Sequence, residues 1–246
     1  MKTIAVGNQK GGVGKTTTTL NLGYALADRG KRVLICDLDP QGSLTVSTGI
    51  DDRPGRSMAE VLAGDLPIDD ILVRINDNLS LAPSDIALSE TELILVGKIG
   101  REVAVKKSLA GLGSRFDYVL LDLPPSLGIL TVNGLAAAQS VLIPAIPQYL
   151  DLRALAIFTK TIDLVKSEIN PDLEIIGILP TFYDGRLKLH GEVLETWQEA
   201  GLPILPLQVK RSIRAAEAPI SGQPIAAYSP EHGEVYKQLA EIIDHG

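Results

Sequence analysis

The sequence predicts an α/β fold, in which a doubly wound, mostly parallel sheet is flanked by helices. Short apolar runs alternate with longer segments of helical periodicity, and a glycine-rich turn joins the first apolar run to the first helical segment. The apolar runs are nearly continuous, which is typical of strands covered on both faces. No change in composition marks a linker within the 246 residues, so we expect one domain over residues 1–246.

Seven apolar runs are predicted as strands. They are Thr3–Val6, Arg32–Cys36, Leu79–Ala82, Tyr118–Asp122, Val141–Ala145, Leu173–Leu179 and Pro203–Leu205. The first helix is expected at Thr16–Asp28, directly after the glycine turn. Two further helices are expected where apolar residues repeat at steps of three and four, at Leu152, Leu155, Phe158, Ile162 and Val165 and at Val235, Leu239, Ile242 and Ile243.

Charge and cysteine content exclude several classes of protein. The formal net charge is −7, so any contact with nucleic acid requires a local basic patch. The single cysteine, Cys36, excludes an internal disulfide framework and any cluster that needs several thiolates of one chain. The apolar runs are far shorter than the ~20 residues that span a bilayer, and no secretory leader is visible, so we expect a cytoplasmic protein. His190, His232 and His245 lack metal-ligand spacing and are expected at the surface.

The stretch "GNQKGGVGKTTTT" at residues 7–19 has the character of a phosphate-binding loop. A strand, a tight glycine turn and a helix N-terminus together offer backbone N–H groups and a positive partial charge to phosphates. Lys15 is placed to reach the β- and γ-phosphates, Thr16 to bind Mg²⁺, and Thr17 to bond the α-phosphate. The residues predicted to bind the nucleotide here are Gly11, Gly12, Val13, Gly14, Lys15, Thr16 and Thr17.

A second lysine, Lys10, stands at the outer lip of the same loop. From that position its side chain cannot easily curl back onto the phosphates of its own loop. Two interpretations remain open. Lys10 is a solvated surface residue, or it reaches a nucleotide held by a second subunit and supplies charge to the transition state, as an arginine finger does.

Two further segments end an apolar run in carboxylates. "VLICDLDPQGSLT" at residues 33–45 carries Asp37 and Asp39, and "DYVLLDLPPSLGILTVNGL" at residues 117–135 carries Asp122. Open α/β sheets place ligands at the carboxyl ends of their strands. A carboxylate there can orient an attacking water, and another can support a metal ion. The alternative is that these aspartates are polar residues of ordinary loops.

The stretch "KGGVGKTT" at residues 10–17 resembles the deviant Walker A motif of the ParA/MinD family of P-loop ATPases. The resemblance implies that Lys10 contacts the partner's ATP in a sandwich dimer, while Lys15 serves its own nucleotide. Residues 33–45 are similar to the family's switch I, which implies that Asp39 orients water and Asp37 lies by the metal. Residues 117–135 are similar to switch II and Walker B, which implies that Asp122 supports Mg²⁺.

Within the family, "PTFYDGR" at 180–186 and "RSIRAAEAPISGQPIAAYSP" at 211–230 look like the ParA branch without an N-terminal DNA-reading domain. The resemblance places Thr181 near the adenine base. It also implies contacts to DNA phosphates by Arg186 and Arg214, with Lys188, Lys210 and Arg211 as neighbours; the alternative is a solvated basic face. Residues 148–152 depart from the Glu-Tyr-Tyr-Ala-Leu stretch that is usual in this branch. The acidic C-terminal helix is unlike the basic membrane helix of MinD-type proteins.

The resemblance implies an enzyme that hydrolyses ATP with Mg²⁺, slowly and under stimulation by DNA and a partner protein. ATP would close a homodimer, which binds nucleoid DNA nonspecifically and partitions a plasmid or chromosome with a ParB-like partner, without a membrane. Two alternatives remain. The same cycle could position a protein cargo such as a carboxysome, another microcompartment or a chemoreceptor cluster, or the chain could be a metabolic P-loop kinase or ligase.

Overall fold

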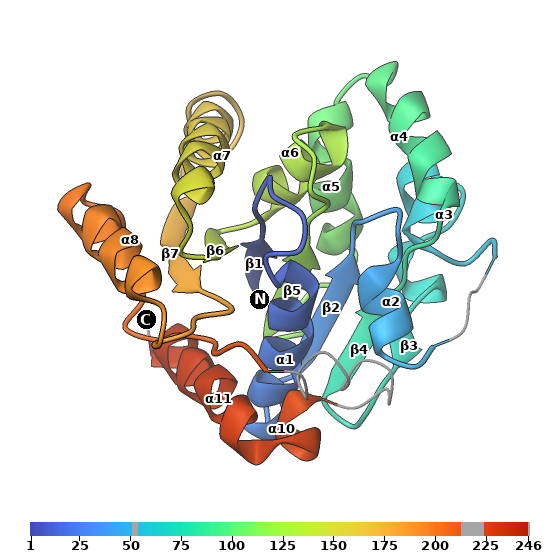
Figure 1. Ribbon diagram of the computed structural model, residues 1–246. Helices are drawn as coiled ribbons and strands as arrows, with labels where there is room; N and C mark the ends of the chain where they lie inside the picture. The colour runs from blue at the N-terminus through green and yellow to red at the C-terminus, as the bar shows by residue number, and fades with distance from the viewer. Residues whose placement is uncertain (51–53, 213–223, 246) are drawn as a thin grey trace.

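The computed structural model describes residues 1–50, 54–212 and 224–245. These residues contain a seven-stranded sheet in the order β3-β4-β2-β5-β1-β6-β7 (Figure 1). β3 pairs antiparallel with β4, and the other neighbouring strands are parallel. The strands are β1 (Lys2–Val6), β2 (Val33–Asp37), β3 (Val73–Arg74), β4 (Leu79–Ala82), β5 (Tyr118–Asp122), β6 (Ser140–Ala145) and β7 (Glu174–Pro180).

Helices cover both faces of this sheet (Figure 1). One face packs against α3 (Met58–Ala63), α4 (Ala87–Val96), α5 (Ala104–Ala110), α6 (Ile129–Ala137), α7 (Tyr149–Glu168) and α8 (Lys188–Glu199). The other face packs against α1 (Lys15–Asp28), α2 (Ser43–Ser47), α10 (Ile225–Tyr228) and α11 (Pro230–His245). Short 3₁₀ turns occupy Ile68–Asp70 and Arg101–Val103.

Neighbouring residues of each central strand point into opposite cores. In β2, Leu34 and Cys36 belong to one apolar cluster, whereas Val33 and Ile35 belong to the other. Both faces therefore require apolar side chains, which explains the continuous apolar runs in the sequence. The predicted doubly wound α/β fold is confirmed.

Two of the predicted elements differ from the structure. Pro203–Leu205 does not form a strand, because only Ile204 makes a single parallel bridge, to Ile178. The sheet gains instead the edge strand β3, whose two residues are too few to give a sequence pattern. In α11, Leu239 and Ile243 are buried as expected, but Ile242 is 37% exposed. The apolar stripe of α11 is therefore narrower than predicted.

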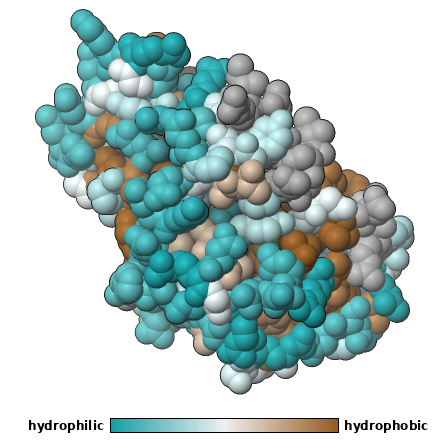
Figure 2. All heavy atoms as spheres, turned by 90° about the horizontal axis from the view of Figure 1, so that it is seen from below, coloured by the Kyte–Doolittle hydropathy of each residue, from teal (hydrophilic) through white to brown (hydrophobic). Residues whose placement is uncertain are grey.

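The face formed by α10 and α11 is largely polar. Figure 2 views the molecule from below, where these helices lie in Figure 1, and hydrophilic side chains cover most of that surface. Glu234 and Glu241 of α11 are exposed there. Within the described residues, no helix has the length and apolarity needed to cross a bilayer.

Strand register brings the predicted site together at one edge of the sheet. β5 lies between β1 and β2, and Asp122 is paired with Val6 of β1 on one side and with Asp37 of β2 on the other. Because these three strands are parallel, their carboxyl ends meet at the same edge. The glycine loop, which follows β1, therefore lies beside both carboxylates.

Candidate nucleotide site

The glycine loop connects β1 to α1 and is fixed at several points. Gly12 and Gly14 have φ angles of 71° and 87°, the left-handed region that favours glycine. A Cβ at Gly12 would meet no atom within 4 Å, so this side of the loop is open. The Asn8 amide donates to the Pro144 carbonyl at 2.8 Å and accepts from the Lys10 N–H at 2.9 Å. The loop thus has the bare, curved backbone that a phosphate requires.

Lys15 and Thr16 begin α1 and point toward the end of β5. Lys15 is buried, and its Nζ donates to the Lys10 carbonyl at 3.1 Å, across the loop. Burial lowers the pKa of Lys15, while the charges of Asp122 and Asp39 act in the opposite direction. The Thr16 hydroxyl donates to Asp122 Oδ2 at 2.7 Å. Thr17 follows on the same turn and is half-buried.

Asp37 and Asp122 are fully buried carboxylates on adjacent strands. Asp122 accepts from the hydroxyls of Thr16 and Thr19, and Asp37 accepts from the Thr45 N–H and hydroxyl at 2.9 and 2.8 Å. Burial raises the pKa of both carboxyls, and for Asp122 the negative charge of Asp37 adds to the effect. For both buried carboxyls to be ionised at once, positive charge beyond that of Lys15 is needed beside them.

These donors fit Mg²⁺ held together with phosphate oxygens. Carboxylate and hydroxyl oxygens are the ligands that Mg²⁺ prefers, and it is usually bound by one or two carboxylates together with phosphates and water. Among the residues that the structure describes, no group of three or more His, Cys, Asp or Glu side chains could hold a metal by itself. The arrangement therefore suits an ion that arrives with a nucleotide better than a resident structural metal.

Asp39 lies in the loop that follows β2. Its Oδ1 accepts from the Gln41 N–H at 3.0 Å, and its own N–H donates to Asp37 Oδ1 at 3.1 Å. Gly42, with a φ of 64°, then precedes α2 as its N-cap. Asp39 is half-buried and close enough to Lys15 to influence its pKa. The structure therefore brings Asp39 to the same edge as the glycine loop.

Lys10 is neither free in solvent nor turned away from its own subunit. Its Nζ lies 2.5 Å from Asp151 Oδ1 and 3.3 Å from Gln148 Oε1, at the start of α7. Neither Asp151 nor Gln148 was among the functional residues predicted from the sequence motifs. A signal was present, since residues 148–152 are where the chain departs from the stretch usual in the ParA branch.

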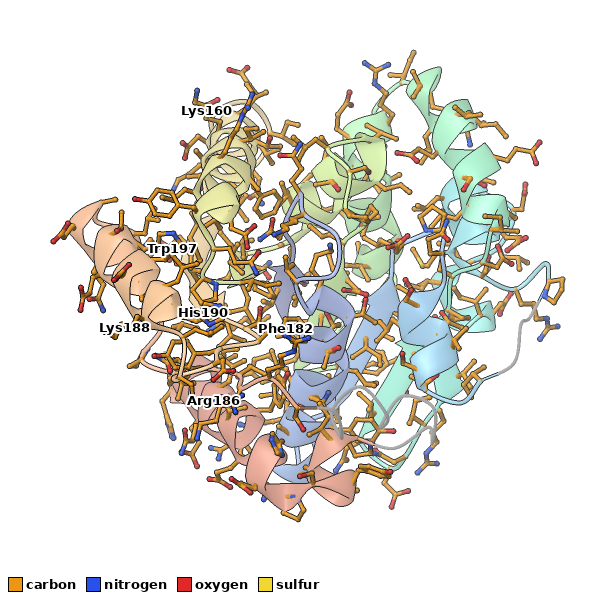
Figure 3. The ribbon with its side chains drawn as sticks, in the orientation of Figure 1. Lys160, Phe182, Arg186, Lys188, His190 and Trp197 are labelled. Atoms are coloured by element: carbon orange, nitrogen blue, oxygen red, sulfur yellow. The ribbon has the colours of Figure 1, made fainter. Side chains whose placement is uncertain are left out.

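Thr181 lies close to the glycine loop and is buried against it. Its hydroxyl donates to the Val13 carbonyl at 2.8 Å, and the residue is 2% exposed. The next residue, Phe182, has a φ of 49°, and its ring lies against Gly14 (Figure 3). Thr181 therefore ties the loop to the end of β7.

The predicted basic residues are only partly brought together. Arg186, Lys210 and Arg211 line one groove of about 1040 Å³, together with Tyr183 and His232 among other residues. The Arg186 side chain is 90% exposed, and its guanidinium forms two hydrogen bonds with Asp184, at 2.9 and 2.8 Å. Lys188 opens α8 and is exposed but does not line the groove, and Arg214 lies outside the described residues.

His190 is buried, contrary to the prediction that it lies at the surface. It is 5% exposed, and its Nδ1 accepts from the Asp184 N–H at 3.0 Å. Its ring centroid lies 5.8 Å from that of Tyr183, and the two rings are tilted by 41°. In α8 the buried side chains are those of His190, Val193, Leu194 and Trp197. His190 begins this stripe of helical spacing, so the periodicity of the segment could have predicted its burial.

Comparison with known proteins identifies the family. Residues 1–175 match a family model described as an AAA domain. The sporulation initiation inhibitor protein Soj of Bacillus subtilis is 41% identical over 247 residues, which cover 98% of this chain and 98% of Soj. The chain belongs to the ParA/MinD family of P-loop ATPases.

Solved structures of similar proteins share the family's fold. A Mycobacterium smegmatis protein named cobyrinic acid a,c-diamide synthase, solved with ADP and magnesium, is 40% identical. It has a TM-score of 0.87 and covers 98% of this chain and 93% of its own. The ATP complex of a Cyanothece McdA variant is 26% identical with a TM-score of 0.90, and covers 99% of this chain and 96% of its own.

Proposed function

We propose that this ParA/MinD family member is a ParA-type ATPase that binds ATP with Mg²⁺ and closes into a dimer around two nucleotides. The observation that carries the proposal is the meeting of Lys15, Thr16, Asp37 and Asp122 at the end of three parallel strands, beside an open glycine loop. These groups match the requirements of phosphoryl transfer, which depends mainly on positioning and charge. The ATP analogue and magnesium bound by the Mycobacterium smegmatis protein support the same ligands here.

Each residue has a role that follows from its chemistry. The N–H groups of Gly11, Gly12, Val13 and Gly14 and the N-terminus of α1 bind the phosphates. Lys15 offsets phosphate charge, and Thr17 bonds the α-phosphate. Thr16, Asp37 and Asp122 would hold Mg²⁺, which would offset negative charge on the phosphates. Asp39 orients the attacking water, and Lys10 supplies charge to the nucleotide of the partner subunit.

The closed dimer would bind DNA through phosphate contacts. The groove that contains Arg186, Lys210 and Arg211 offers cations on a chain whose net charge is −7, and Lys188 and Arg214 would extend the patch. Such contacts are weak and independent of sequence, so doubling them in a dimer makes binding conditional on ATP. A ParB-like partner would then stimulate hydrolysis and release the DNA. A protein with this cycle would lie in the cytoplasm, on the nucleoid. Residues 1–246 would form its single ATPase domain.

A DNA retardation assay tests this function. Protein with ATP is expected to retard nonspecific duplex DNA, protein with ADP is not, and raised salt abolishes the shift because the contacts are to phosphates. Equal retardation with both nucleotides would contradict an ATP-controlled switch.

A lysine variant tests the dimer mechanism. Lys10→Ala is expected to keep ATP binding, because Lys15 remains, and to lose hydrolysis. Wild-type turnover in this variant would show that Lys10 does not contribute to the reaction. The ATPase rate should be measured across protein concentrations, since a reaction that needs two subunits rises more than linearly.

Two other functions are compatible with the same site. The ATP cycle could position a protein cargo instead of DNA, and the two cargo classes differ in the partner that stimulates hydrolysis. The name of the Mycobacterium smegmatis protein, a diamide synthase of cobyrinic acid, favours a metabolic P-loop ligase. A ligase would turn over ATP only with its small substrate and would ignore DNA. Measuring ATPase rates with DNA, with the protein encoded next to this one, and with neither separates the three.

A further inference from the structure

The contact between Lys10 and α7 joins parts of the chain that are 141 residues apart. Lys10 Nζ lies 2.5 Å from Asp151 Oδ1, in the first turn of the 20-residue helix α7, and 3.3 Å from Gln148 Oε1 just before it. Lys10 also donates its backbone N–H to Asn8, which fixes the direction in which the side chain leaves the loop. The contact is therefore part of how the loop is built.

Asp151 is a buried carboxylate that depends on Lys10 for its countercharge. The Asp151 side chain is 1% exposed, whereas that of Lys10 is 33% exposed. Among the described residues, Asp151 Oδ2 has no hydrogen-bond partner, so Lys10 supplies the main countercharge to a buried carboxylate. Removing the partner of a buried charge is costly, while the lysine itself can return to solvent at little cost. The ion pair consequently stabilises the conformation in which the Lys10 side chain contacts its own subunit.

In the dimer proposed above, the Lys10 ammonium leaves Asp151 of its own subunit for a phosphate of the partner's nucleotide. We propose that Asp151, assisted by Gln148, restrains Lys10 within its own subunit and thereby opposes closure of the ATP dimer. This inference rests on the proposed function, in which Lys10 acts across the dimer. Closure of the dimer must break the Lys10–Asp151 contact in each subunit. The free energy of breaking this contact therefore raises the dimer dissociation constant twice, once for each subunit. Asp151 is a positioning residue in this scheme, because it acts through Lys10.

The test compares dimerisation of the whole chain with Mg²⁺ and the non-hydrolysable analogue AMPPNP by analytical ultracentrifugation. Asp151→Asn keeps the shape of the side chain and removes its charge. If each contact opposes closure about tenfold, which corresponds to ~1.4 kcal/mol, the dimer dissociation constant falls on the order of a hundredfold. Asp163→Asn is the matched control, because Asp163 is an exposed residue of the same helix and its loss changes the net charge equally.

A second measurement reports on the contact without a dimer. Brief acetylation by sulfo-N-hydroxysuccinimide acetate, without nucleotide, followed by mass spectrometry gives the reactivity of Lys10. Asp151→Asn is expected to raise this rate about tenfold, the factor assumed for each contact. Gln148→Ala, at an exposed residue, is expected to raise it by a smaller factor, and Asp163→Asn should leave it unchanged.

The outcomes separate the two proposals. A wild-type chain that dimerises, with an Asp151→Asn variant that dimerises equally or less tightly, overturns the restraint and leaves the proposed function standing. If neither chain dimerises with AMPPNP, the proposed function fails and the restraint fails with it. An unchanged acetylation rate in Asp151→Asn shows that the ion pair does not hold Lys10 in solution, and also overturns the restraint. A tighter dimer together with faster acetylation supports it.

Discussion

The hydrogen bond from Thr181 to the glycine loop yields a sharp prediction about nucleotide binding. The Thr181 hydroxyl donates to the Val13 carbonyl at 2.8 Å, and both residues are buried. Resemblance to the family suggests a role near the adenine base, whereas the geometry suggests that Thr181 supports the phosphate-binding loop. Substitution Thr181→Val separates these roles, because it keeps the shape of the side chain and removes the donor.

The size of the effect follows from the burial of the bond. Leaving a buried carbonyl without its donor costs about 1–3 kcal/mol. If the loop relaxes to satisfy Val13 in another way, a nucleotide must restore the binding conformation and its affinity falls by that amount. The dissociation constant then rises roughly 5- to 150-fold. The loss should be the same for ATP and for inorganic tripolyphosphate, because the two share the loop and differ in the base.

Isothermal titration calorimetry with ATP and with tripolyphosphate, each with Mg²⁺, measures both constants. Thr181→Ser is the matched control, since it keeps the hydroxyl and should bind both ligands within a few-fold of wild type. The melting temperature of each variant should be recorded, so that a general loss of stability is distinguished from a local one. If Thr181→Val weakens ATP but not tripolyphosphate, the residue contacts the base and the reasoning from the loop is wrong.

Three further predictions concern stability, each measured by thermal unfolding. Gly233→Val should lower the melting temperature by roughly 2–12 °C, because a side chain there would overlap Ala226 and overpacking costs about 1–3 kcal/mol, whereas Gly191→Ala, in open space on α8, should not lower it. Hydrogen bonds, of which that from Lys31 has the largest effect, lower the pKa of Asp244 to about 2. Asp244→Asn should therefore be less stable than wild type above about pH 4, with a difference that is lost as the pH falls through 2. A constant difference would contradict this assignment. The pKa of Asp122 is raised, so ionisation of this carboxyl destabilises the folded chain as the pH rises above about 4, its ordinary pKa. Without Mg²⁺, Asp122→Asn should therefore be more stable than wild type at pH 8 and not at pH 4.

The residues whose position in the fold the sequence predicted well are those set by short spacing. Around the glycine loop, β1, the turn and α1 follow one another within residues 2–28, so local spacing sets the positions of Lys15 and Thr16 at the start of the helix. Asp37 and Asp122 were placed correctly at strand ends, because each follows an unbroken apolar run. Their pairing across adjacent strands follows from the order of the sheet.

What the sequence did not predict depends on contacts between distant segments. The ion pair of Lys10 with Asp151 and the hydrogen bond of Thr181 to Val13 join residues 141 and 168 positions apart. Neither contact follows from local spacing, since a single lysine, aspartate or threonine fits many environments. The departure at residues 148–152 marks the segment that contacts Lys10 but does not name its partner. The burial of His190 is a different failure: the helical stripe was present, but a polar residue at its start was taken for a surface residue.

The two buried carboxylates show how the site and the stability of the fold oppose each other. Asp37 and Asp122 share the end of neighbouring strands at 0% exposure, and burial disfavours the charged form of both. An apolar or amide side chain in either position would relieve this cost, so stability alone does not account for the pair. Hydroxyls of Thr16, Thr19 and Thr45 supply neutral donors that lessen the cost without removing it. The charge that would balance the pair is that of a bound cation, which explains why the fold keeps two acids where packing alone would favour none.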